Sequence, residues 1–284
     1  MTLIRRMTFE ELTQQIQWAK QEGWEPGGSD PELFWNLDPD GFLAMEQENQ
    51  FIGGGAIIRH SEQYGFMGLF IVDQKYRGQG LGTKLWYARR DQLLERLAPE
   101  GCIGLDGVYE MVPFYEKGGF RQETTHRRFR LDLPSSAAQK QDSICELSSI
   151  DWSKVIELDR QCFPASRESF LKQWVSQPTA IAYGCVSNGT LHGYGVMRAC
   201  PSGWRVAPLF AESYEAANAL FLAFQTHQAG KPLFLDVPDD NPHAQKLCRE
   251  YGMEESFGCV RMYYGNSPSF DRQKVFGVTT FEVG

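Results

Sequence analysis

A strand-like run, a glycine-rich turn and an amphipathic helix follow one another in residues 64–97. The turn reads RGQGLG, so Gly78, Gly80 and Gly82 occupy alternate positions. Glycine has no β-carbon to keep a ligand away from the main chain, and it adopts the positive φ of a tight turn. The N–H groups that begin a helix add positive potential. The stretch therefore predicts a strand feeding a helix, with a phosphate site at the turn and the Arg77 guanidinium at its rim.

The spacing of the turn differs from that of two common nucleotide-binding loops. No Lys-Ser or Lys-Thr pair follows the glycines, as a P-loop requires. No GxGxxG with a following ribose-binding acid is present either. ATP and NAD are therefore disfavoured as ligands.

The two halves of the chain show the same order of secondary-structure patterns. Each half reads as a strand, two helices, three strands, a helix, a strand, a short helix and a final strand. This repetition predicts a duplicated α+β domain, each copy with one mostly antiparallel sheet flanked by helices. The small and polar stretch LPSSAAQKQDS indicates a linker. We expect an N-terminal domain over 1–133, a linker over 134–142 and a C-terminal domain over 143–284.

Composition excludes several classes of function. A formal net charge of −8 argues against an extended nucleic-acid surface, and THRRFRLD, the one basic cluster, is interpreted as a solvated strand face. No apolar run is long enough for a membrane span, and the amino terminus lacks a signal-peptide pattern, so we expect a cytoplasmic protein. The seven cysteines include no CxxC pair, which disfavours a metal site and a disulfide framework. We expect a monomer or a homodimer.

Two motifs carry a resemblance to a known family. RGQGLG, directly after the strand-like LFIV, resembles the pyrophosphate loop [R/Q]xxGx[G/A] of the GCN5-related N-acetyltransferases (GNAT). FYEKGGF gives Tyr115, Gly119 and Phe120 the spacing of the second family signature, a tyrosine four residues before a Gly-Phe pair. The whole chain is similar to the tandem bacterial subgroup with a degenerate second domain. The resemblance implies two GNAT-like domains, each with a splayed central strand pair.

The resemblance also implies a cosubstrate and a set of residues that bind it. The family binds acetyl-CoA, with strand backbone on the pantetheine arm and loop amides on the pyrophosphate, and no metal is expected. In the family the tyrosine, here Tyr115, protonates the leaving thiolate, which suits a phenol with a pKa near 10; a packed aromatic is the alternative for this residue. The implied cofactor-binding residues are Phe70, Ile71, Val72, Arg77, Gly78, Gln79, Gly80, Leu81, Gly82 and Thr83.

Several residues are candidates for binding the amine acceptor and for taking its proton. An aliphatic amine is mostly protonated at pH 7, so its proton needs an acceptor. Asp106, at the end of a predicted strand, is the first candidate, with Glu110 and Glu25 next; a strand-end cap or an ion-pair partner is the alternative for Asp106. Trp24 and Glu25 are candidate substrate-binding residues. The predicted reaction is direct acetyl transfer to a small-molecule amine, and the alternatives are a protein or peptide acceptor and a non-catalytic acyl-CoA-binding sensor.

The second half departs from the family pattern at both motifs. Its strand-to-helix passage, GWRVAPLFAESYEAANAL, contains no RGxGxG, and Cys248 stands where the first half has Tyr115. Asn241 and Ala244 keep the family's NxxA helix start. We expect that this half has lost its cofactor site and retains the fold for packing and for closing the acceptor pocket.

Overall fold

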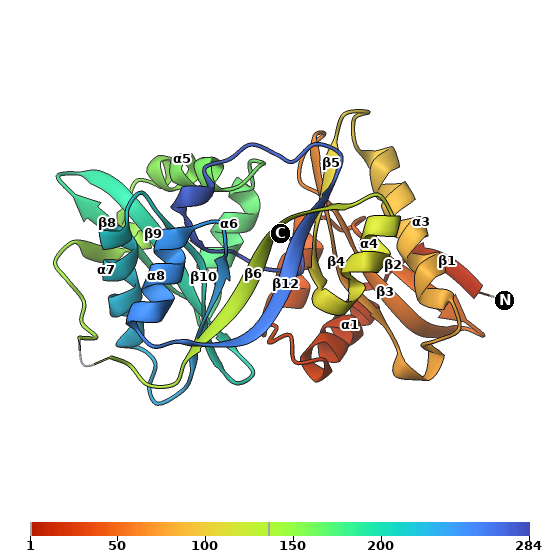
Figure 1. Cartoon of the computed structure of the whole chain (residues 1–284), viewed down its shortest axis with the longest axis horizontal. Coiled ribbons are helices and arrows are strands. Elements are labelled where there is room, and N and C mark those ends of the chain that lie inside the picture. The colour runs from red at the N-terminus through yellow and green to blue at the C-terminus, as the bar shows by residue number, and fades with distance from the viewer. Residues whose placement is uncertain (1, 136) are drawn as a thin grey trace. The chain divides into compact units, whose positions relative to one another are not determined.

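The computed structural model describes residues 2–135 and 137–284 (Figure 1). Its mixed helices and mostly antiparallel strands confirm the predicted α+β class. Two compact units are present: Met1–Glu123 with Arg261–Pro268 and Phe281–Gly284, and Thr124–Val260 with Ser269–Thr280. Each unit thus combines segments that are distant in sequence. The division into 1–133, 134–142 and 143–284 treats each domain as one continuous stretch and stays a prediction; residue 136 of that linker lies outside the described residues.

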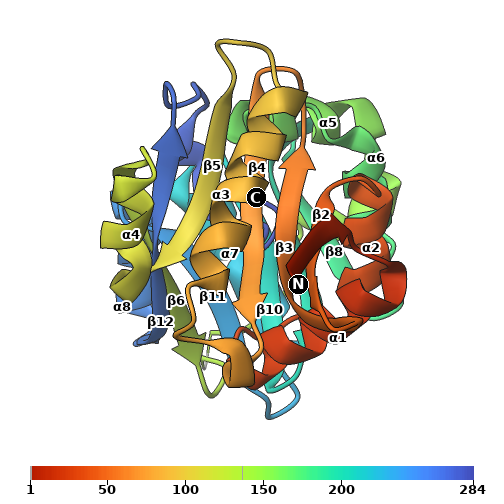
Figure 2. The same cartoon turned by 90° about the vertical axis from the view of Figure 1, so that its right-hand side faces the viewer.

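The first unit has a five-strand core in the order β1-β2-β3-β4-β5, antiparallel except for the parallel β4–β5 pair. The helix α3 lies across these strands (Figure 2). The elements follow the predicted order closely, including the short helix after the first loop. Their bounds are β1 Thr2–Arg6, α1 Phe9–Gln21, α2 Asp30–Leu37, β2 Phe42–Gln47, β3 Gln50–Arg59, β4 Tyr64–Val72, α3 Leu81–Arg96, β5 Cys102–Val108 and α4 Val112–Lys117.

Helix α1 begins with a capping box. The Thr8 hydroxyl accepts a hydrogen bond from the Glu11 N–H (3.2 Å), and the Glu11 carboxylate accepts one from the Thr8 N–H (2.9 Å). Two N–H groups that the helix leaves without partners are thereby satisfied. One face of α1 is buried, and Trp18 stacks on Phe51 of β3 with 5.0 Å between the ring centroids. The capping box and this contact fix α1 against the sheet.

Strand β4 contains a β-bulge, and its pairing with β5 is short. Gly54 of β3 pairs with Ile71 and Ala56 pairs with Gly68, so β4 has one residue more than β3 between these pairs. The β4–β5 ladder runs from Tyr64 to Phe66 and covers no later β4 residue among those described. The two strands therefore separate toward their carboxyl ends, where α3 begins after β4.

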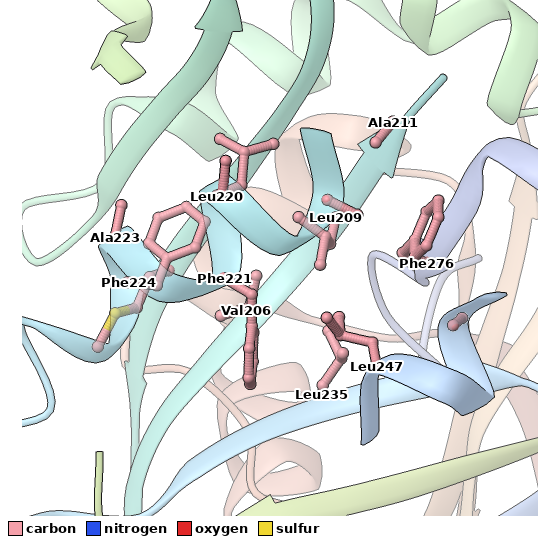
Figure 3. Packing of buried hydrophobic residues seen from close by; sticks show 14 of the residues in the cluster. Val206, Leu209, Ala211, Leu220, Phe221, Ala223, Phe224, Leu235, Leu247 and Phe276 are labelled. Atoms are coloured by element: carbon pink, nitrogen blue, oxygen red, sulfur yellow. The ribbon is translucent and has the colours of Figure 1, made fainter. Parts of the chain in front are cut away.

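The second unit repeats this plan. Its strand order is β12-β6-β11-β10-β9-β8-β7, and β13 pairs with β10. Helix α7 packs Leu220 and Phe224 against Val206 and Leu209 of β10 (Figure 3). Its elements, of which β6 and β12 each have one end in the first unit, are β6 Arg121–Leu131, β7 Ile144–Glu146, α5 Trp152–Cys162, α6 Glu168–Val175, β8 Ile181–Ser187, β9 Thr190–Cys200, β10 Gly203–Ala211, α7 Tyr214–Gln225, β11 Leu233–Pro238, α8 Pro242–Glu250, β12 Glu254–Tyr264 and β13 Val275–Gly277.

The interpretation of THRRFRLD as a solvated strand face is wrong for part of this strand. Arg128 is 2% exposed, and its guanidinium donates to both carboxylate oxygens of Asp236 (2.6 and 2.9 Å). His126 is buried as well. A charge can be buried on a strand when its cross-strand neighbour carries the opposite charge, and Arg128 lies directly opposite Asp236 in the β6–β11 ladder.

None of the helices in the described part of the chain is both long and apolar enough to cross a lipid bilayer.

Candidate active site

The glycine turn leads into the N-terminus of α3 with its backbone N–H groups available. Gly78 and Gly80 both have a φ of 76°, the left-handed region that glycine adopts without a steric penalty. Within the described residues no side chain caps α3, and its first turn is closed by the bond from Lys84 N–H to Gly80 O (3.2 Å). The N–H groups of Leu81, Gly82 and Thr83 thus have no helical acceptor. This geometry suits an anion such as a pyrophosphate.

The turn is also open to a ligand. A β-carbon placed on Gly78 or Gly80 would meet no described atom within 4 Å. A β-carbon on Gly82 would lie 3.5 Å from Phe70 Cζ and 3.7 Å from a methyl group of Val72. The predicted pyrophosphate loop and the predicted pantetheine-binding end of β4 therefore lie side by side.

Arg77 is held in a more specific way than the sequence predicted. Its Nε donates to the Val72 carbonyl (2.8 Å), and its Nη2 donates to the Glu22 carboxylate (2.5 Å). The side chains of Arg77 and Glu22 are 44% and 31% exposed. The guanidinium thus connects the loop to β4 by a hydrogen bond and to the end of α1 by an ion pair with Glu22.

Where β4 and β5 separate, one edge of β4 has no strand partner among the described residues. Phe70, Ile71 and Val72 follow the three residue pairs that form the parallel ladder. Main-chain N–H and C=O groups on such an edge are available to an extended ligand. The Val72 carbonyl already accepts a hydrogen bond from Arg77, so the other main-chain groups of Phe70–Val72 are the ones open to a ligand, and their binding of the pantetheine arm stays a prediction.

Tyr115 lies at the carboxyl end of β5. A β-carbon on Gly107 would lie 2.5 Å from the Tyr115 ring, and the ring stacks on Trp86 of α3 with 5.8 Å between the centroids. Burial raises the pKa of Tyr115 to about 12, against the opposing charge of Arg89. None of the described residues forms a hydrogen bond with its hydroxyl. Tyr115 therefore stays protonated at neutral pH with a proton to donate.

The Tyr-Gly-Phe spacing has a local cause. The Phe120 N–H donates to the Tyr115 carbonyl (3.1 Å), and Gly119, with a φ of 93°, turns the chain out of α4. The Phe120 side chain, which is 2% exposed, then packs against Trp86. The motif closes the helix that carries the tyrosine and fixes its ring.

Asp106 lies on the opposite face of β5 from Tyr115, because its neighbour Gly107 faces the tyrosine ring and alternate strand residues point to opposite faces. Both of its oxygens accept hydrogen bonds from Arg261, at 3.0 Å from Nε and 2.7 Å from Nη2. Burial lowers the pKa of Arg261, but Asp106 outweighs this, so the guanidinium is held charged. The Asp106 carboxylate is thus engaged in an ion pair, the alternative considered for it from the sequence.

Trp24 and Glu25 lie directly after α1 and are half-buried. The Trp24 N–H donates to Ala19 O (3.0 Å), and Glu25 has a φ of 59°. Their contact with a substrate stays a prediction. Glu110 is exposed and precedes α4.

Sequence reasoning missed two buried polar residues next to β4. Gln15 of α1 and Arg89 of α3 are both fully buried and donate to carbonyl groups around the β4 bulge. The signal that could have revealed them is the run Gly53–Gly55 inside a strand, because glycine in a strand often marks a bulge or a close approach. A β-carbon on Gly55 would lie 2.5 Å from Arg89 Cζ.

The second unit lacks the open helix start. The N-terminus of α7 is capped by Ser213, whose hydroxyl accepts from the Ala216 N–H (3.2 Å). Cys248 is a buried helix residue, and burial raises the pKa of its thiol to about 12. Asn241 caps α8 by accepting from the N–H groups of His243 and Ala244. These residues serve the fold of the unit.

Comparisons with known proteins match both halves of the chain. The model "Acetyltransferase (GNAT) family" matches residues 9–120, and the model "Acetyltransferase (GNAT) domain" matches residues 155–277. The chain is 26% identical over 270 residues to the holothin acyltransferase of Pseudoalteromonas sp., covering 94% of this chain and 90% of that protein. It is 26% identical over 221 residues to the uncharacterized N-acetyltransferase YitH of Bacillus subtilis, covering 77% and 76% of the two chains.

Solved structures share the fold over nearly the whole chain. A protein of Pyrococcus horikoshii superposes with a TM-score of 0.84 at 21% identity, covering 100% of this chain and 96% of that one. A tandem GNAT protein from the clavulanic acid biosynthesis pathway superposes with a TM-score of 0.64 at 14% identity, covering 95% and 100%. The tandem arrangement expected from the sequence is thereby confirmed.

Proposed function

Because the chain belongs to the GCN5-related N-acetyltransferase (GNAT) family and is an N-acyltransferase, we propose that its first unit transfers an acetyl group from acetyl-CoA to the amine of a small molecule. The observation that carries the proposal is the uncapped start of α3 beside the separated ends of β4 and β5. The loop from Arg77 to Thr83 binds the pyrophosphate, with the Arg77 guanidinium at its rim because the Arg77 N–H is already bonded to Gln74 O. The edge of β4 at Phe70–Val72 binds the pantetheine arm.

The residues present fit this cosubstrate. A pyrophosphate needs several convergent N–H donors and main chain that it can approach closely, and the glycine turn offers both. An extended amide chain needs an unfilled strand edge, and β4 has one. Acetyl-CoA supplies the activated acyl group as its thioester.

In the transfer step the neutral amine attacks the thioester carbonyl. The new bond joins the amine nitrogen to the acetyl carbon, and the bond that breaks joins this carbon to the sulfur. Tyr115 gives its phenolic proton to the departing thiolate, which is worth about 10²–10⁴ in rate for a positioned acid. Asp106 is the proposed acceptor of the amine proton, acting through water because Arg261 occupies both of its oxygens.

A small-molecule acceptor is supported by one relative. The protein that matches 94% of this chain is named holothin acyltransferase, so its name gives holothin, and no protein or peptide, as the acyl acceptor. Trp24 and Glu25 are the proposed wall and anchor of the acceptor site.

The test measures free-thiol release from acetyl-CoA with pooled small amines and, separately, with pooled peptides. Wild-type protein is compared with Tyr115→Phe, and acetyl-CoA binding to both proteins is measured by calorimetry. We expect release with the small amines, a large loss of release in Tyr115→Phe, and unchanged binding. Release with peptides alone would overturn the proposed acceptor. Binding without release from any pool would favour a sensor.

A further inference from the structure

The bulge in β4 holds a leucine in an unfavourable backbone conformation. Leu69 has a φ of 48°. Residues other than glycine, asparagine and aspartate rarely adopt such an angle. It lies in the stretch where β4 has one residue more than β3, between the pairs Gly68–Ala56 and Ile71–Gly54. Such strain persists only when surrounding groups hold the backbone in place.

Gln15 supplies one of these groups. Its side-chain amide nitrogen donates to Leu69 O (2.7 Å) and Gly54 O (3.0 Å), and it lies 3.4 Å from Ile71 O. Its oxygen Oε1 is buried and finds no hydrogen-bond partner in the described part of the chain. A buried acceptor without a partner is unfavourable. Packing alone therefore does not account for a glutamine here, whereas its contacts with the bulge do.

Arg89 supplies the second group. Its Nη2 donates to Gly68 O and to Ala56 O, each at 2.6 Å, and its guanidinium lies 5.1 Å from the centre of the Phe70 ring. Gly55 leaves the space that this guanidinium fills. Arg89 is fully buried, and among the residues described no carboxylate lies within ion-pair distance of it. Its charge therefore acts on the carbonyl groups at the bulge and on the face of Phe70.

The two side chains approach the bulge from opposite faces of the sheet. A β-carbon on Gly54 would lie 2.2 Å from Met7 Cε and 3.3 Å from Phe51, whose ring stacks on Trp18 of α1, whereas one on Gly55 would lie 2.5 Å from Arg89 Cζ of α3. Figure 2 shows α3 lying across these strands. Gln15 and Arg89 together bind carbonyl groups of both strands on either side of Leu69.

The second unit contains the same bulge with a different support. Between Val206 and Leu209, β10 has one residue more than β9, so Ala207 corresponds to Leu69. The Trp174 indole N–H donates to Ala207 O at 2.7 Å. Both copies thus bind the carbonyl of the corresponding bulge residue with a buried N–H donor. The second unit, whose helix start is capped, binds this carbonyl with the large and mostly apolar side chain of Trp174.

We propose that Gln15 and Arg89 are positioning residues that hold the β4 bulge, and with it the following edge of β4 where acetyl-CoA is proposed to bind, in the geometry that the transfer step requires. This inference rests on the proposed acetyl transfer. Small misplacements of reacting groups can cost about 10²-fold in rate. Loss of either support should therefore lower kcat more than it weakens binding of acetyl-CoA, which other parts of β4 and the glycine turn provide.

The test compares Gln15→Met, Arg89→Lys and Arg89→Met with Ile16→Val, a control that trims a neighbouring buried residue of α1. Methionine keeps the approximate shape of glutamine without a donor. Lysine keeps the positive charge of Arg89 but lacks the planar guanidinium that donates to two carbonyl groups. For each folded protein we would measure kcat, the KM for acetyl-CoA, and hydrogen exchange of peptides that cover residues 66–72.

We expect Gln15→Met to lower kcat about 10- to 100-fold with a KM for acetyl-CoA within about threefold of wild type, and to speed exchange in residues 66–72. Arg89→Lys should retain more activity than Arg89→Met. Ile16→Val should change neither kcat nor exchange. An unchanged kcat in Gln15→Met would overturn the inference, as would unchanged exchange. If wild-type protein transfers no acetyl group, the proposed function fails, and exchange alone then decides whether the two residues hold the bulge.

Discussion

Gly80 offers a test of the pyrophosphate site in which stability and binding should change in opposite directions. Gly80→Asn and Gly80→Asp have nearly the same size, and a β-carbon here meets no described atom within 4 Å. Both variants must adopt the positive φ of 76°, at a cost of about 1–2 kcal/mol that asparagine and aspartate tolerate better than other residues. They differ in one negative charge at the N-terminus of α3. That charge should favour the helix by about 0.3–1 kcal/mol, so Gly80→Asp should melt at the same or a higher temperature than Gly80→Asn.

Binding of acetyl-CoA should respond in the opposite sense. Two unit charges about 4 Å apart repel by about 1 kcal/mol in water and about 4 kcal/mol at an effective dielectric constant near 20. Gly80→Asp should therefore bind acetyl-CoA about 5- to 700-fold more weakly than Gly80→Asn, since about 1.4 kcal/mol is a factor of ten. Calorimetric titration at low salt and in about 1 M NaCl is the assay, and high salt should reduce the difference. Equal affinities of the two folded variants at low salt would refute the assignment of the pyrophosphate to this turn.

Three further predictions follow from contacts around β4 and β5. Because burial raises the pKa of Tyr115 to about 12, its acid form persists through neutral and mildly alkaline pH, and kcat/KM measured from about pH 7 to 10 should rise as the amine loses its proton. A fall with a midpoint near pH 9 would contradict a Tyr115 pKa of about 12. Asp106→Asn should lower the free energy of unfolding in urea by about 3–5 kcal/mol, because it leaves the buried Arg261 without its carboxylate. Adding Arg261→Gln should restore part of that loss, and an active double variant would show that Asp106 is not the proton acceptor. Gly68→Ala should speed hydrogen exchange in residues 281–284, because its β-carbon would lie 2.0 Å from Glu282 O; unchanged exchange would contradict this packing.

The features that the sequence predicted well are those that act over a few residues. The glycine turn before α3 is explained by the positive φ of its glycines and by the uncapped start of the helix. The Tyr115-Gly119-Phe120 spacing is explained by the main-chain bonds that end the short helix α4. The order of helices and strands could also be predicted, because apolar periodicity and turn residues are local signals. The family resemblance rests on these same short stretches.

The features that the sequence did not reveal depend on residues far apart in the chain. The partner of Asp106 is Arg261, 155 positions away, and no local pattern connects them. Gln15 reaches carbonyl groups 39 to 56 positions later. Residues 281–284 belong to the first unit although the sequence assigns them to the second half. Long-range contacts of this kind decide whether a carboxylate is a free base or an ion-pair partner, so the role of Asp106 could not be derived from its position at the end of a strand.

The internal repeat separates what this fold requires from what the proposed reaction requires. Both units keep the bulge in the third strand of their antiparallel meander, β4 or β10, and both bind the carbonyl of the corresponding bulge residue, Leu69 or Ala207, with a buried N–H donor. The bulge is therefore a property of the fold. The helix that follows that strand begins differently in the two units, with Gly80 and uncapped amides in one and the Ser213 cap in the other. A serine cap occupies an N–H group that an anion would otherwise bind, so the second unit keeps the bulged strand of the proposed acyl-CoA site without the open helix start that is proposed to bind the pyrophosphate. Restoring those donors would require removing the cap and introducing glycines that adopt positive φ, which a single substitution cannot do.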